Sequence, residues 1–178
     1  MKRLFILLTL LVGLNACAGM NVNVMGVDVK RIKEMKPIEA IGGALVAIGV
    51  HELGHIAAME ALDVEYTFTN PISFRFTGEL TNSEMGWIYR SGYILQALGG
   101  SLLNTIPATR QSDFTIGYNG MSAFQMAIQP FDVGEKMLGG GPSDYTHLDK
   151  YEHDAFMEWL GYMAWADLNL YYSIKKND

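Results

Sequence analysis

Cysteine is almost absent from this sequence: Cys17 is the only one in 178 residues. A single thiol excludes a disulfide within the chain, so stability has to come from core packing or from a bound metal ion. Charged residues are also scarce, at 18% of the chain, which is below the share in a typical soluble domain. The balance is acidic, with 13 Lys and Arg against 19 Asp and Glu, and no basic patch with interleaved aromatic residues occurs. This composition argues against nucleic-acid binding.

The first 16 residues have the pattern of a bacterial export signal. Lys2 and Arg3 precede an apolar run, Leu4 to Leu14, that is too short to span a membrane as a stable helix. Leu14-Asn15-Ala16-Cys17 resembles the lipobox of bacterial lipoproteins, in which the cysteine is acylated and becomes the mature N-terminus. We therefore expect residues 1–16 to be a lipoprotein signal peptide; a plain signal peptide cleaved nearby is the alternative.

An acylated Cys17 would hold the protein at a bilayer without any spanning helix. The next residue is Ala18, and similarity to lipoprotein sorting implies that it lacks the aspartate-type signal for retention in the inner membrane. We expect a lipid-anchored protein of the bacterial cell envelope, in the outer membrane and facing the periplasm. Ionisable residues such as Glu52 and Glu158 interrupt the long apolar segments, which favours a helical domain outside the bilayer over a short intramembrane bundle.

The remaining chain predicts a mainly α fold, with residues 17–36 as a tether and residues 37–178 as one helical domain. Pro37 suits the first turn of a helix, and a small β-hairpin is expected after that helix. In chain order, the sequence predicts a helix over 38–62, strands over 64–69 and 72–77, and helices over 83–103, 123–130, 131–138 and 144–174.

One pentad carries most of the chemical information: His51-Glu52-Leu53-Gly54-His55, an H-E-x-x-H motif inside the first expected helix. Residues four apart lie on one face of a helix, so the two imidazoles can ligate the same metal ion. In zinc hydrolases with this motif, zinc activates a water molecule, and the glutamate is the general base that takes its proton. The alternative is two buried histidines and a glutamate that hydrogen-bond within the core, which would be costly to satisfy without a function.

A hydrolytic zinc site needs a third protein ligand and an open position for water. Ala58 and Ala61 stand where a metzincin would have glycine and histidine, which excludes that family. A thermolysin-like enzyme would use a later glutamate, and Glu79 and Glu84 are the candidates, although neither lies in a clear helical motif.

The segment from His51 to Ala61, followed by a short β segment, resembles the site-2 protease family of zinc metallopeptidases. Gly100-Ser-Leu-Leu-Asn104 is loosely similar to that family's Gly-Pro-x-x-Asn element, with Ser101 in place of proline; the resemblance gives Asn104 a role in orienting substrate, and helix packing is the alternative. The family completes its zinc site with an aspartate at the mouth of a later apolar helix.

Two aspartates match that third-ligand position. Asp132, in Phe131-Asp-Val-Gly, is closer in letters, whereas Asp144 opens the last long apolar helix after a glycine-rich loop. We favour Asp144 because of this placement at a helix start. His147 follows one turn later and is expected either to replace it as a ligand or to support it from outside the ligand shell.

The sequence therefore predicts a zinc metallopeptidase of the cell envelope that hydrolyses peptide bonds in a protein or peptide substrate. His51, His55 and Asp144 are the expected Zn²⁺ ligands, Glu52 the catalytic base and Cys17 the lipidation site. The rival hypothesis is a non-catalytic envelope lipoprotein with a structural or vestigial metal site.

Overall fold

The structure, a computed structural model, describes residues 23–24, 27–28, 34–70, 73–131, 144–151 and 154–175. The expected signal peptide, Cys17 and Asp132 lie outside these residues. The elements in chain order are β1 (Asn23–Val24), β2 (Val27–Asp28), α3 (Pro37–Ala61), β3 (Tyr66–Asn70), β4 (Ser73–Phe76), α4 (Asn82–Thr105), α5 (Asp113–Ile128), the short 3-10 helix η2 (Gln129–Phe131), α7 (Asp144–Tyr151) and α8 (Ala155–Ile174). The prediction of a mainly helical fold with a small hairpin after the first long helix is confirmed.

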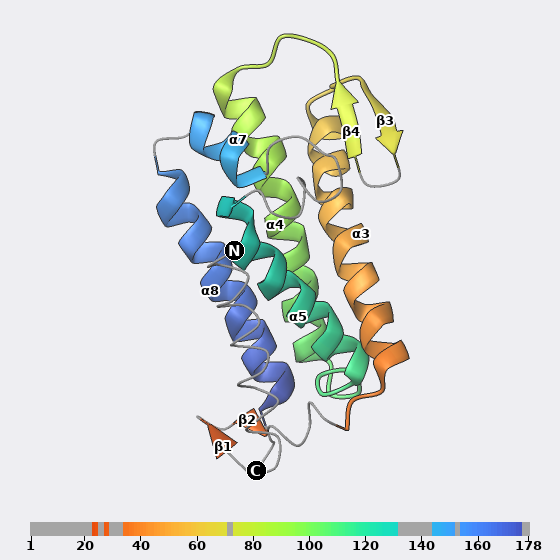
Figure 1. The fold of residues 1–178 in the computed structure, drawn as a ribbon. Helices are drawn as coiled ribbons and strands as arrows, with labels where there is room; N and C mark the ends of the chain where they lie inside the picture. Colours follow the sequence, from red (N-terminus) through yellow and green to blue (C-terminus); the bar gives the residue numbers. More distant parts are fainter. Residues whose placement is uncertain are drawn as a thin grey trace.

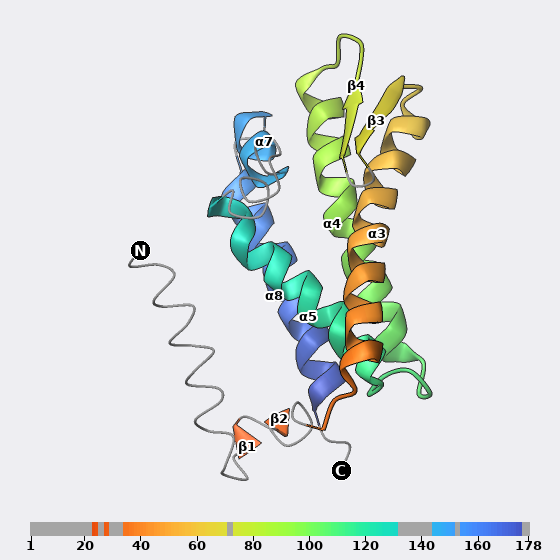
Figure 2. The same cartoon turned by 45° about the vertical axis from the view of Figure 1, so that its right-hand side comes forward.

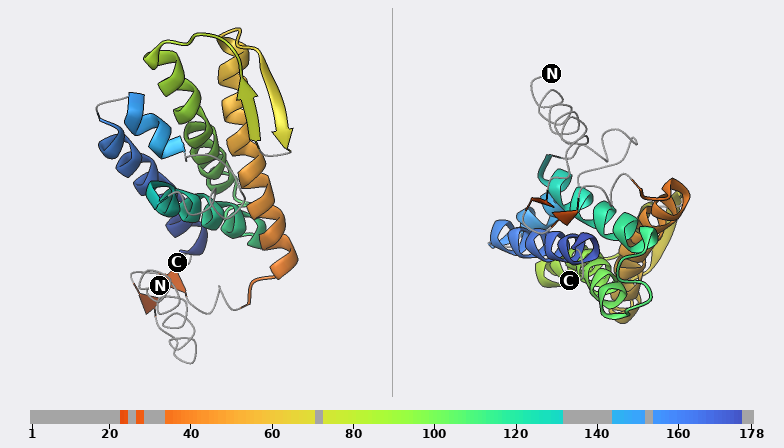
Figure 3. Two further views of the ribbon diagram at one scale, coloured as in Figure 1. Left: turned by 45° about the horizontal axis from the view of Figure 1, so that its top comes forward. Right: turned by 90° about the horizontal axis from the view of Figure 1, so that it is seen from below.

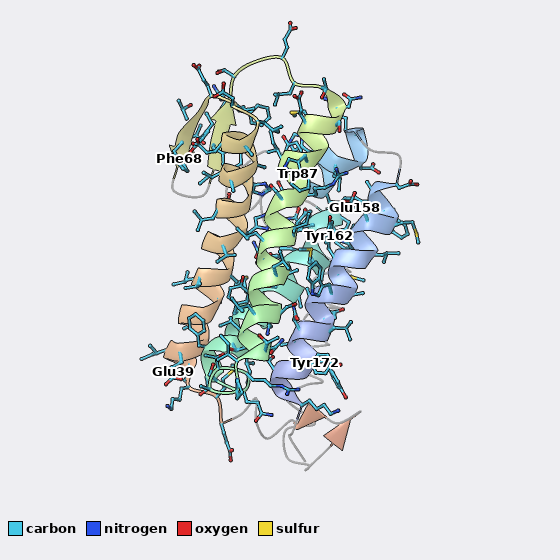
Figure 4. The ribbon with its side chains drawn as sticks, turned by 180° about the vertical axis from the view of Figure 1, so that it is seen from behind. Glu39, Phe68, Trp87, Glu158, Tyr162 and Tyr172 are labelled. Carbon is cyan, nitrogen blue, oxygen red and sulfur yellow. The ribbon has the colours of Figure 1, made fainter. Side chains whose placement is uncertain are left out.

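The four long helices, α3, α4, α5 and α8, form one bundle (Figure 1). Viewed from behind, α3, α4 and α8 lie side by side with α4 in the middle (Figure 4). Helix α5 packs across the other side of this layer, where it contacts α3 and α8 (Figure 3). The β3–β4 hairpin lies beside α3 and α4 at one end of the bundle, and α7 lies at the same end (Figure 2).

Close helix packing explains why so many glycines occur in the long helices. A Cβ on Gly43 of α3 would collide with the backbone carbonyl of Phe114 in α5, and a Cβ on Gly117 of α5 would collide with the backbone of Ala40 in α3. Backbone meets backbone at this crossing, which glycine alone permits. The crossing fixes the angle at which α3 enters the bundle.

The structure corrects two of the expected helices. Helix α5 begins at Asp113, ten residues before the expected start at 123, and Ser112 caps it by accepting a hydrogen bond from the Thr115 backbone N–H at 3.1 Å. The expected helix over 144–174 is two helices, α7 and α8, which pack separately against the bundle. The expected helix over 131–138 falls almost entirely on residues outside the described part of the chain.

Two large apolar faces remain exposed on the outside of the bundle. They are formed by Ile38, Ile41, Leu45, Val46 and Leu53 on α3 and by Trp87, Leu95, Leu98 and Leu102 on α4. Leu45 is 64% exposed and Leu102 is 61% exposed. From position 91 to position 105 the sequence of α4 contains no Asp, Glu, Lys or Arg. Helix α3 is long and apolar enough to cross a membrane by length and composition. Exposed apolar side chains gathered along the outside of a bundle are typical of interaction surfaces.

Candidate metal centre

Helix α3 brings the two histidines of the pentad together inside the bundle. His51 is 3% exposed and His55 is 2% exposed, and their Nε2 atoms lie 3.1 Å apart. The four-residue spacing puts both rings on the face of α3 that is covered by α4. Two imidazole nitrogens converge there on one point.

Asp144 supplies a third donor atom at this point, from the first residue of α7. Its Oδ2 lies 2.8 Å from Nε2 of His51 and 3.2 Å from Nε2 of His55. Asp144 lies 93 positions after His51 and 89 positions after His55 in the sequence, so the tertiary fold brings it to them. Among the described residues, His51, His55 and Asp144 form a group that could hold a metal ion.

The backbone carbonyl of Ile88 in α4 fixes the orientation of the His55 ring. Nδ1 of His55 lies 2.7 Å from the carbonyl oxygen of Ile88. A carbonyl oxygen can only accept, so Nδ1 carries the proton and donates it. In the neutral ring this leaves the lone pair on Nε2, which faces His51 and Asp144. A second hydrogen bond, from Ser91 Oγ to the same carbonyl at 2.6 Å, ties this turn of α4 together.

Two glycines allow α3 and α4 to approach each other at this level. A Cβ on Gly92 of α4 would lie 2.5 Å from Nε2 of His55 and 2.9 Å from Cε1 of His51. A Cβ on Gly54 of α3 would collide with the backbone carbonyl of Ser91. Sequence alone does not reveal the role of Gly92, because that role depends on which helix lies opposite. The signal was a glycine inside an otherwise regular helical pattern, which usually has a packing or functional reason.

The charges of the group interact strongly. Burial lowers the pKa of His55, but the Asp144 carboxylate and Glu52 outweigh it and raise that pKa to about 9. Burial favours the neutral form of Asp144, yet the two histidines beside it hold the pKa of Asp144 well below its usual range. Without a metal ion, the site therefore favours a negative Asp144 beside a protonated His55. A metal ion competes with that proton for the Nε2 lone pair of His55, so a site that stabilises the positive charge of the proton also suits a metal cation.

Glu52 lies next to the group and is half-buried. Its carboxylate interacts electrostatically with His51, His55 and Asp144. Burial raises the pKa of Glu52, Asp144 raises it further, and His51 and His55 act in the opposite direction, with a net rise. A carboxylate with a raised pKa binds a proton more readily near neutral pH than an exposed glutamate does.

Most of the other candidate residues lie away from the group. Glu84 caps α4 in a capping box with Thr81, its carboxylate accepting from the Thr81 backbone N–H at 2.8 Å, and Glu79 is exposed. The ring of His147 stacks on the ring of Tyr89. Asn104 donates from Nδ2 to the backbone carbonyl of Asn169 at 2.9 Å, which is the helix-packing alternative.

Comparison of the chain with protein-family models, with curated proteins and with solved structures found no match.

Proposed function

We propose that this protein is a zinc metallopeptidase, with His51, His55 and Asp144 as the ligands and Glu52 as the general base. The observation that carries the proposal is the convergence of three donor atoms, 2.8 to 3.2 Å from one another, beside a half-buried glutamate. Ligand atoms about 2.0–2.1 Å from a tetrahedral zinc ion lie roughly 3.3 Å from each other. The observed separations are close to that value.

The donor set favours zinc over harder cations. Calcium and magnesium prefer shells of oxygen ligands, whereas zinc binds imidazole nitrogen and carboxylate oxygen readily. Three protein ligands leave one of four positions open, which is the pattern of catalytic rather than structural zinc sites. Two histidines and one carboxylate are also the ligand set of several zinc peptidases.

Each residue then has a chemical role. His55 is oriented by the carbonyl of Ile88, which keeps its Nε2 lone pair toward the ligand position. A zinc ion held by His51, His55 and Asp144 would supply a Lewis acid for the attacking water and for the carbonyl of the peptide bond. Glu52 is placed to accept the proton of that water and to transfer it to the departing amine. The substrate in this proposal is a protein or peptide.

Kinship with the site-2 protease family is part of this proposal and rests on the pentad, the hairpin that follows it and the position of Asp144 at the start of a late helix. Asn104 is not included among the functional residues, because its side chain joins α4 to α8 through Asn169.

The location we propose is the bacterial cell envelope, with a lipid anchor on Cys17 holding the domain at the outer membrane on its periplasmic side. The exposed apolar faces of α3 and α4 support a membrane location, since an uncharged surface of this kind is stable against lipid acyl chains. In this proposal the faces contact the bilayer to which the anchor is attached.

Metal analysis is the direct test of the proposed centre. The purified protein should contain about one zinc ion per chain, should lose peptide hydrolysis when a strong chelator removes the ion, and should regain it when zinc is restored. Elemental analysis and a fluorogenic peptide assay measure the two quantities. A protein that contains no metal, and that a chelator leaves unchanged in stability and activity, contradicts the proposal.

Membrane attachment is tested in two parts. The native chain should incorporate a labelled fatty acid in bacteria, and Cys17→Ser should not. Because of the apolar faces, Cys17→Ser should remain partly bound to membranes, and adding Leu45→Glu should move it to the soluble fraction, whereas adding Leu45→Ala should not. Full release by Cys17→Ser alone would show that the apolar faces make no contact with lipid.

A further inference from the structure

The position of the third ligand depends on how a very short helix is held. Asp144 is the first residue of α7, which spans only Asp144–Tyr151. A helix of this length is not stable alone in water, so packing has to keep it in place. Whatever fixes α7 against the bundle also fixes the Asp144 carboxylate relative to the two histidines.

The best-aligned contact of α7 is an aromatic stack on α4. The ring of His147 lies flat on the ring of Tyr89, with centroids 4.4 Å apart and an angle of 1° between the planes. His147 follows Asp144 by three residues, so the stack acts on the first turn of α7. Tyr89 is buried in the bundle and is therefore a rigid platform. Leu148, the residue after His147 in α7, is fully buried.

The same turn of α4 holds the rest of the centre. The Ile88 carbonyl orients His55, and the missing Cβ of Gly92 leaves space for both histidine rings. Tyr89 lies between these two residues in sequence. One turn of α4, residues 88–92, is thus in contact with all the elements that carry the three proposed ligands.

We infer that Tyr89 and His147 are a positioning pair, whose ring stack sets α7 so that Asp144 completes the metal centre. The inference rests on the proposed function. It gives His147 a role through the shape of its ring and not through its nitrogen atoms, and it makes Tyr89 a determinant of metal affinity although it offers no ligand to the ion.

Cobalt(II) binding to the full chain tests this, because the absorption of the bound ion reports on the number and arrangement of its ligands. We expect His147→Leu to weaken cobalt binding by about 10- to 100-fold, the usual effect of losing a residue that orients a ligand, and to change the spectrum. His147→Phe keeps a flat ring and removes both nitrogens, so it should bind cobalt within about threefold of the native protein with an unchanged spectrum. Tyr89→Leu should behave like His147→Leu.

Tyr172→Leu is the matched control, because Tyr172 pairs with Tyr171 at the far end of α8 (Figure 4). It should leave the affinity and the spectrum unchanged. Circular dichroism of each metal-free variant shows whether the fold is retained, and His147, which is only half-buried, provides the safer variant if Tyr89→Leu does not fold.

The possible outcomes separate the two proposals. Native-like cobalt binding by His147→Leu overturns the positioning role and leaves the metal centre intact. Equal losses in His147→Phe and His147→Leu also overturn it, since the imidazole nitrogens and not the ring stack would then matter. A native protein that binds neither cobalt nor zinc overturns the proposed function and this inference together.

Discussion

A Glu52→Gln variant is expected to bind zinc as the native protein does and to hydrolyse peptides about 10² to 10⁴ times more slowly. The range is the usual contribution of a general base. Glutamine has nearly the same size as glutamate but cannot accept the proton of the attacking water. Since Glu52 is a neighbour of the ligand group and not one of its three members, the change should leave the metal in place. Zinc content and kcat on one peptide substrate measure the two effects.

The result also separates the proposed enzyme from its rival. In a non-catalytic lipoprotein with a structural metal site, the native protein and the Glu52→Gln variant would both hold zinc and neither would cleave peptides. Glu60→Gln, at the exposed next-to-last position of α3, is a suitable control because it makes the same chemical change away from the group. A Glu52→Gln variant with full activity would remove Glu52 from the mechanism.

Local spacing explains which parts of the centre the sequence could predict. His51 and His55 are one helical turn apart, so once α3 is a helix their side chains must share a face. No knowledge of the rest of the fold is needed for that step. Glu52 does not share that face, since residues one apart point in different directions, and the sequence places it near the centre only because it directly follows His51.

The third position was predictable only in part. The preference for Asp144 over Asp132 assumes that Asp144 opens the last long apolar helix. In the structure Asp144 opens the short helix α7 instead, and the fold still brings it to the two histidines. Sequence alone supports this choice only weakly, because Asp144 lies 89 positions after His55. The role of Gly92 was out of reach for the same reason, since its partner rings belong to another helix.

Helix positions were predictable from the sequence where the capping residues and the helical periodicity were clear. Helices α3 and α4 match their expected ranges to within about two residues at each end. The start of α5 was missed although Ser112 is a good N-cap, because Gly117 and Gly120 weakened the helical pattern. Gly117 is required by the close approach of α3, a tertiary constraint that propensity does not contain. The division between α7 and α8 has the same origin, because α7 is set by its packing on α4.

Replacing Asp144 by Ala is expected to lower zinc affinity by more than about 100-fold and to abolish hydrolysis. Loss of a residue that merely orients a ligand costs about 10- to 100-fold, and loss of the ligand itself should cost more. The carboxylate is also the anionic partner of both histidines, at 2.8 and 3.2 Å, so the variant leaves the two imidazoles without a negative charge between them. Titration against a chelator of known affinity measures the change.

Two further variants show whether the loss of zinc affinity is specific to Asp144. Asp132→Ala tests the other aspartate favoured by the sequence and should keep native zinc affinity. Asp149→Ala removes an exposed carboxylate from the same short helix and should also bind zinc normally, which shows that the effect is specific to the first residue of α7. If Asp132→Ala loses zinc while Asp144→Ala retains it, the third ligand is Asp132, and the contacts of Asp144 with His51 and His55 are a salt-bridge network in the core.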